Sequence, residues 1–202
     1  MQRSQAVPRT PVKEQIDYLG KTWAKIKYQI PGKDEKLDAI HKLEEHAAQV
    51  TAAYPDHAEP KIWEGVILST DAGIVKGLSA LGKVKKARML FEEAIKEDPN
   101  AVDGGAYTSL GSLYYQVPGW PIGFGDDKQA EKYLKLGLQV SPDGIDSNFF
   151  YGDFLLQDDR YSEAKTYFER ALKAPDRPGR ALADAGRRQE IKAKLTEMSD
   201  HL

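Results

Sequence analysis

Side chains that could carry catalysis or hold a metal are few and scattered in this 202-residue sequence. The four histidines are His41, His46, His57 and His201. His41 and His46 are five residues apart on one expected helix, so their rings face different sides and do not converge on a metal. Cysteine is absent, which excludes disulfides, thiol catalysis and Cys-ligated metals.

Known catalytic motifs are also missing from the sequence. We find no phosphate-binding G-x-x-x-x-G-K-[ST], no G-x-S-x-G and no H-E-x-x-H. An enzyme built on Tyr115, Asp126 and Asp127 is a third-ranked hypothesis, because no motif positions a base or nucleophile beside them. We therefore predict that the chain is not an enzyme and has no catalytic residues, metal site or cofactor.

The most distinctive segment is 117–127, which contains two prolines and three glycines together with two large aromatic residues. Such a composition opposes regular structure and predicts a loop between two helices. In one interpretation Trp120 and Phe124 plug the mouth of the hairpin, while Asp126 caps a helix that begins near Lys128. In the other, the two aromatic residues form one wall of a binding cleft.

Charge gives no sign of a nucleic-acid partner, because 29 basic and 31 acidic residues leave a formal net charge of -2. Two local basic clusters are interpreted as solvated helix faces, although the second could instead receive an anionic partner. The first is the run Lys83, Lys85, Lys86 and Arg88. The second consists of Arg177, Arg180, Arg187 and Arg188, where Asp184 would pair with Arg180 and Arg188 at i,i+4 spacing. No apolar run is long enough for a transmembrane segment.

The elements that would position these residues follow a repeat. Pro55, Pro99 and Pro142 recur at intervals of 44 and 43 residues, and a glycine follows each of them: Gly65, Gly111 and Gly152. Proline stops a helix, and a glycine within a helix allows a partner helix to approach closely. We therefore predict consecutive helix hairpins in which the three glycines lie at equivalent contacts.

The last unit resembles the tetratricopeptide repeat. The resemblance rests on Tyr151, Gly152 and Leu155 in one helix, then Ala164, Phe168 and Ala171 in the next, with Pro175 beyond them. The preceding units share the pattern with longer connections, since Gly65 is followed by Ala87 and Gly111 by Ala130. The resemblance implies an all-α, right-handed α-solenoid of about four helix hairpins plus a C-terminal capping helix. A second resemblance, on residues 123–126 and the helix after them, is to the T-component family associated with tripartite ATP-independent transporters, and it implies an exported protein that helps to handle a small ligand.

Domain boundaries follow from the prolines. We predict a flexible tail at 1–10 and helical repeats over 11–176, divided at about 11–55, 56–99, 100–142 and 143–176. The capping helix occupies 177–202 and carries a sparse apolar stripe, as the end of a solenoid requires.

The predicted function is that of a non-enzymatic scaffold that binds a peptide or protein segment in its concave groove. Counting from each glycine places the following residues in that groove or on its loop: Thr108, Ser112, Tyr115, Gln116, Trp120, Phe124, Phe149, Asp153, Leu156 and Gln157. These positions lack Lys and Arg, which argues against recognition of a free carboxylate there. The alternative is a small-molecule-binding accessory protein of a bacterial transport system.

Location and assembly are less constrained by the sequence. We favour the periplasm, with the cytoplasm as the alternative, because proteins similar to the second family are exported and the polar start is compatible with a removed signal peptide. Open solenoid ends, with Trp23 or Tyr28 exposed, would also allow a homo-oligomer.

Overall fold

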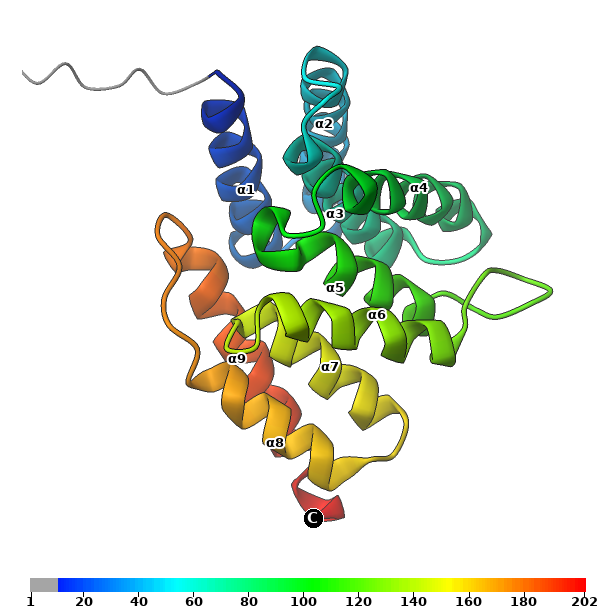
Figure 1. The fold of residues 1–202 in the computed structure, drawn as a ribbon, viewed down its shortest axis with the longest axis vertical. Coiled ribbons are helices and arrows are strands. Elements are labelled where there is room, and N and C mark those ends of the chain that lie inside the picture. Colours follow the sequence, from blue (N-terminus) through cyan, green and yellow to red (C-terminus); the bar gives the residue numbers. More distant parts are fainter. Residues whose placement is uncertain (1–10) are drawn as a thin grey trace, which may run out of the picture.

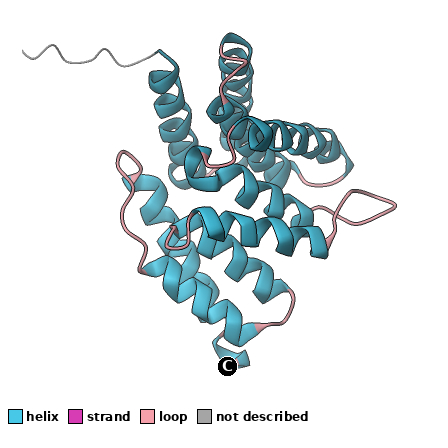
Figure 2. Ribbon diagram, viewed as in Figure 1, coloured by secondary structure: helices cyan, strands magenta, loops and turns pink. Residues whose placement is uncertain are grey.

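A computed structural model describes residues 11–202, and over this range the chain consists of helices and loops (Figure 2). The expected tail at 1–10 lies outside the described residues. The α-helices are α1 (Pro11–Gln29), α2 (Lys33–Ala53), α3 (Ala58–Val75), α4 (Leu81–Glu97), α5 (Ala101–Gln116), α6 (Asp127–Val140), α7 (Ile145–Gln157), α8 (Tyr161–Leu172) and α9 (Ala181–Glu197). Two short 3-10 helices, η1 (Leu78–Ala80) and η2 (Ser199–His201), complete the described part. None of the described helices is both long and apolar enough to span a bilayer.

Neighbouring helices pack as hairpins, and α3–α4, α5–α6 and α7–α8 make the most extensive contacts (Figure 1). The predicted all-α repeat is confirmed. One hydrophobic core runs through α3 to α9, and a second joins α1 and α2 to Trp63 and Ile67 of α3. The two cores meet at α3, so the N-terminal hairpin is continuous with the repeats.

The three repeat glycines lie at equivalent helix contacts, as predicted. A Cβ atom added at Gly65 would meet the Phe91 ring at 2.5 Å, and one added at Gly152 would meet the Phe168 ring at 2.9 Å. At Gly111 the same atom would meet Leu134 Cγ at 2.7 Å. Phe91, Leu134 and Phe168 each lie four positions after the alanine of the repeat pattern in the same helix. The same packing arrangement therefore recurs in all three hairpins.

The C-terminal helix does more than cover the last hairpin. α9 packs against α8 and α7, where Ile191 and Met198 are fully buried, and it also lies against α1 (Figure 1). At this contact Gly186 faces the ring of Tyr28, whose hydroxyl donates a hydrogen bond to Glu190. The contact brings together α1 and α9, the first and last α-helices of the described residues.

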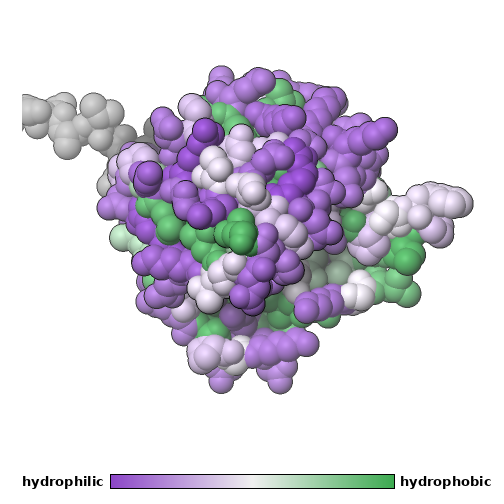
Figure 3. All heavy atoms as spheres, turned by 90° about the horizontal axis from the view of Figure 1, so that it is seen from below, coloured by the Kyte–Doolittle hydropathy of each residue, from purple (hydrophilic) through white to green (hydrophobic). Residues whose placement is uncertain are grey.

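The 117–127 loop projects from the helical body (Figure 1), and it stands out from a mostly hydrophilic surface in Figure 3. Asp126 caps α6 as expected, because its carboxylate accepts a 3.1 Å hydrogen bond from the backbone N–H of Gln129. The interpretation in which Trp120 plugs the hairpin was wrong, since this side chain is 90% exposed. Phe124 packs on Tyr114 instead, with ring centroids 5.7 Å apart.

Candidate functional site

A cavity of about 870 Å³ lies on the inner side of the helices, and we call it the groove. Its walls come from the first helix of each hairpin, α1, α3, α5 and α7, and from α9 together with the segment before it. Because α9 contacts α1, the groove is enclosed where these two helices meet. One site thus collects side chains from the whole length of the described chain.

The α1 and α3 side of the groove is aromatic. Trp23 and Trp63 meet at an edge, with ring centroids 5.9 Å apart. The Trp23 indole N–H donates a 2.9 Å hydrogen bond to the Thr70 hydroxyl, which fixes the ring. Both rings belong to the core and are only 5% and 6% exposed, so they present a small part of their apolar surface to the groove.

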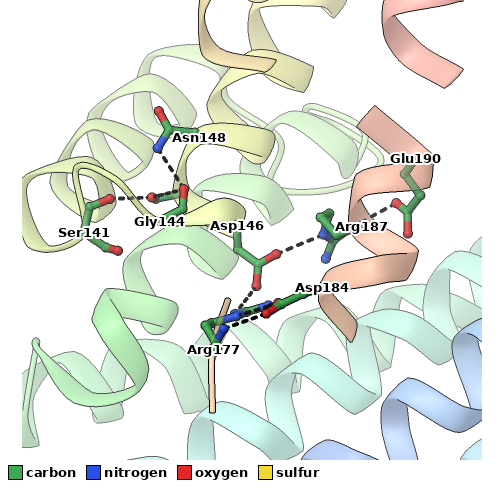
Figure 4. A network of polar contacts seen from close by, with 9 residues as sticks. Ser141, Gly144, Asp146, Asn148, Arg177, Asp184, Arg187 and Glu190 are labelled. Atoms are coloured by element: carbon green, nitrogen blue, oxygen red, sulfur yellow. Dashed lines mark hydrogen bonds and ion pairs between the residues drawn. The ribbon is translucent and has the colours of Figure 1, made fainter. Parts of the chain in front are cut away.

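The α7 and α9 side of the groove is charged, and Figure 4 shows its network. The Asp146 carboxylate accepts 2.9 Å hydrogen bonds from Arg177 Nη1 and from Arg187 Nε. Burial raises the pKa of Asp146, but the charges of Arg187 and Arg177 outweigh it and hold this pKa well below its usual range. Asp146 therefore stays ionised and bridges two segments that are far apart in the sequence.

Arg187 is the most buried cation of this network, at 4% exposure. Its guanidinium carbon lies 4.5 Å from the ring centroid of Phe149 and 4.9 Å from that of Phe150, and Nη1 donates a 3.0 Å hydrogen bond to Glu190. Burial lowers its pKa, but the adjacent charge of Asp146 leads the opposing effects, and the pKa is raised overall. Arg187 is thus fixed by ion pairs and ring contacts at once.

The interpretation of the last helix as a solvated charged face was wrong. Asp184 is buried, at 1% exposure, and accepts hydrogen bonds from the backbone N–H and the guanidinium of Arg177. It pairs with neither Arg180 nor Arg188; Arg188 instead lies 2.7 Å from Asp176. The i,i+4 spacing within the last helix did not predict this arrangement, because the true partners come from α7 and from the segment before α9.

Two other cations at the groove, Lys27 and Arg180, have less of their charge balanced by nearby carboxylates. Burial, followed by the repulsion of Arg187, lowers the pKa of Lys27 to about 8. Burial, followed by the repulsion of Arg177, also lowers the pKa of Arg180. Arg180 forms no ion pair within residues 11–202, and its buried Nε has no hydrogen-bond partner there. Its guanidinium instead lies over the Trp63 ring, 5.0 Å from the centroid.

The structure brings together half of the residues expected in the groove. Those that line it are Thr108, Ser112, Gln116, Phe149 and Asp153. Tyr115 stands beside the groove, and its hydroxyl donates a 2.7 Å hydrogen bond to Asp153. Leu156, Gln157, Trp120 and Phe124 are not among the lining residues. Phe124 instead lines a second hollow with Arg88 and Tyr133.

Sequence reasoning missed the other half of the groove. Trp23, Lys27 and Trp63 line it, and so do Arg177, Arg180 and Arg187. Counting from repeat glycines could not find Trp23 and Lys27, which lie on the N-terminal hairpin, or the three arginines, which lie at the C-terminal helix. Trp63 lies two residues before Gly65 in α3, at a position that the counting left out. Two signals were available: the apolar stripe that contains Trp23, and the arginine cluster near the start of the last helix.

Three residues at the start of α5, beside the groove, have an unusual backbone conformation. Val102, Asp103 and Gly104 have φ values of 50°, 53° and 74°. A positive φ is rare for a β-branched residue such as Val102, so packing must impose this turn. Val102 and Asp103 both line the groove, where the turn presents them.

The groove offers no cluster of metal-binding side chains. Across residues 11–202 no three His, Asp or Glu side chains are grouped so that they could hold a metal ion. Tyr115, Asp126 and Asp127 do not form one site either, because Asp126 caps α6 and Tyr115 binds Asp153. The chemistry available in the groove is ion pairing, hydrogen bonding and aromatic contact.

Comparison with known proteins identifies the last hairpin. A family model of the tetratricopeptide repeat matches residues 145–176, the segment that contains α7 and α8. No curated protein matches the chain. A solved structure titled "Functional Characterization of Pseudomonas Aeruginosa pilF" is similar with 12% identity over 94% of each chain and a TM-score of 0.37, which is too low to support a functional argument. Residues 145–176 therefore form a tetratricopeptide repeat within an all-α chain.

Proposed function

We propose that the protein is a non-enzymatic interaction module that binds a short segment of a partner protein in the groove. The observation that carries the proposal is that four repeat helices and α9 converge on one cavity with an aromatic side and a charged side. Tetratricopeptide repeats are in general protein-interaction scaffolds, which is consistent with this assignment. Partner segments with apolar and charged side chains in alternation suit such a surface.

The size of the groove limits what it can hold. Its volume of about 870 Å³ falls within the roughly 300–1,000 Å³ typical of sites for small ligands. A few residues of a partner fit this space, whereas a long extended peptide does not. The same size favours the second candidate function, a small-molecule-binding accessory protein of a transport system.

A groove-filling substitution tests the proposal. Ser112 is half-buried on the groove wall, so Ser112→Trp would place a large ring in the cavity. Ser162, which is exposed at the start of α8 and outside the groove lining, provides the matched control Ser162→Trp. We expect peptides selected from a random phage-displayed library to bind the native chain and Ser162→Trp, but not Ser112→Trp.

Two results would decide against peptide binding. If no peptide is enriched, or if the enriched peptides bind Ser112→Trp as well as the native chain, the groove is not a peptide site. A panel of small metabolites that raises the melting temperature of the native chain but not of Ser112→Trp would then favour the second candidate.

A further inference from the structure

Among the arginines that line the groove, Arg180 alone forms no ion pair with a carboxylate of the described residues. Arg177 and Arg187 each form two ion pairs with carboxylates, at 2.6 to 3.0 Å. Arg180 has no such pair, and its Nε is buried without an acceptor. Burying a hydrogen-bond donor without an acceptor lowers the free energy of unfolding. The presence of such a donor at a cavity therefore calls for an explanation.

The local electrostatics are consistent with this arrangement. Burial, followed by the repulsion of Arg177, lowers the pKa of Arg180. Asp146 and Asp184 attract the guanidinium, but neither forms an ion pair with it, because both pair with Arg177 instead.

Apolar surface lies directly beside this cation. The Arg180 guanidinium covers the Trp63 ring, and Trp63 in turn contacts Trp23. Trp63 and Trp23 are only 6% and 5% exposed. A ligand whose anionic group reaches Arg180 would therefore also find apolar contacts among half-buried lining residues such as Val66 and Phe150. The guanidinium is planar and suits a carboxylate, with which it can form two parallel hydrogen bonds.

We propose that Arg180 and Trp63 form a subsite for a carboxylate joined to an apolar group. This inference rests on the proposed function, since it specifies what the groove binds. The carboxylate can belong to a small organic acid or to the free C-terminus of a partner segment, and both sources share the same chemistry. The groove positions expected from the repeat pattern lack Lys and Arg, so the cation comes from the segment that precedes α9.

The test compares acids with their amides by isothermal titration calorimetry. One probe pair is 4-phenylbutyrate and 4-phenylbutyramide, and the other is the acetylated tripeptide Leu-Phe-Leu with a free or an amidated C-terminus. We expect at least one acid to bind the native chain about tenfold more tightly than its amide, as a charge-assisted hydrogen bond would give. The pair that shows the preference identifies the source of the carboxylate.

Two variants assign this preference to Arg180. Arg180→Gln should bind acid and amide equally. Arg188→Gln, which removes a cation paired with Asp176 outside the groove lining, should keep the tenfold preference. Thermal melting of each variant verifies that it folds.

Several outcomes would overturn the inference. Equal binding of acid and amide by the native chain would do so, as would a preference that survives Arg180→Gln, or no binding of any of the four probes. If library peptides still bind in a manner blocked by Ser112→Trp, the proposed function stands and only the carboxylate subsite fails. If Ser112→Trp blocks nothing, both fail.

Discussion

Gly186 of α9 lies so close to Tyr28 of α1 that an added Cβ atom would meet the Tyr28 ring at 2.5 Å. The Cγ atom is among the atoms contacted, so a turn of the ring about its own axis could not relieve the clash. The Tyr28 hydroxyl is also held by Glu190, one helical turn beyond Gly186. This contact joins the two ends of the described chain and encloses the groove.

Gly186→Ala should therefore destabilise the protein. An added methyl group that forces packed elements apart costs about 1–3 kcal/mol in free energy of unfolding. Gly82→Ala is the matched control, because Gly82 is also helical and an added Cβ would meet nothing within 4 Å. That control should gain roughly 0.5–1 kcal/mol from helix propensity. Urea unfolding measures both, and equal stabilisation of the two variants would disprove a tight α1–α9 contact.

The repeat glycines give a second prediction. The stability lost when alanine replaces one of them should depend on whether the added Cβ meets backbone or side-chain atoms. At Gly111 an added Cβ would lie 2.9 Å from the backbone nitrogen of Leu134, whereas at Gly152 it would meet only the Phe168 side chain. A side chain can shift more readily than backbone within a packed hairpin. Gly111→Ala should therefore lower the free energy of unfolding by more than Gly152→Ala, by about 1 kcal/mol or more. If Gly152→Ala is the more costly, the α5–α6 hairpin is packed less closely than described.

Local signals in the sequence were sufficient for the hairpins. Gly65, Gly111 and Gly152 with their partner alanines mark contacts between helices that adjoin in the chain, and prolines mark the corners. Each of these features acts over a few tens of residues, so one repeat can be compared with the next. Asp126 as a helix cap is equally local, and it too was predicted correctly.

The enclosed groove could not be predicted in the same way. Asp146 and Arg187 are 41 residues apart, and Tyr28 and Glu190 are 162 residues apart. Nothing in the charged pattern of α9 distinguishes an arginine that reaches α7 from one that pairs within its own helix. The i,i+4 pairs that the sequence suggested are worth only a few tenths of a kcal/mol, so buried partners elsewhere outcompete them.

The contrast between Arg187 and Arg180 gives a third prediction. Arg187→Gln would leave Asp146 and Glu190 each with one partner fewer inside the fold, and breaking a buried ion pair typically costs about 3–5 kcal/mol. Arg180→Gln removes a cation that forms no ion pair with a described anion and loses only its contact with the Trp63 ring, so the free energy of unfolding should fall by about 1 kcal/mol or less. Urea unfolding in the absence of ligand tests both variants. A similar loss for the two would mean that Arg180 supports the fold in a way that its contacts do not explain.

A buried carboxylate pair between α2 and α3 gives the last prediction. Burial, followed by a hydrogen bond with Asp71, raises the pKa of Glu44 to about 8 from its ordinary 4.5. Asp71 is fully buried and faces Lys83 Nζ at 2.8 Å and His41 Nε2 at 3.0 Å, and Lys83 also lies 3.1 Å from Glu44. The folded state thus keeps a proton on Glu44 that the unfolded chain releases above about pH 4.5.

The sign of the pH effect follows from this difference in bound protons. Between about pH 4.5 and 8 the folded state holds more protons at Glu44, so this residue's contribution to stability is complete below that window and is lost as the pH rises through it. Glu44→Gln cannot titrate, so its melting temperature should fall less than that of the native chain between pH 5 and pH 8. Glu45→Gln, which changes the exposed neighbouring carboxylate, should follow the native chain. An unchanged pH dependence in Glu44→Gln would mean that Glu44 is already ionised in the folded state, with Lys83 rather than a proton compensating its charge.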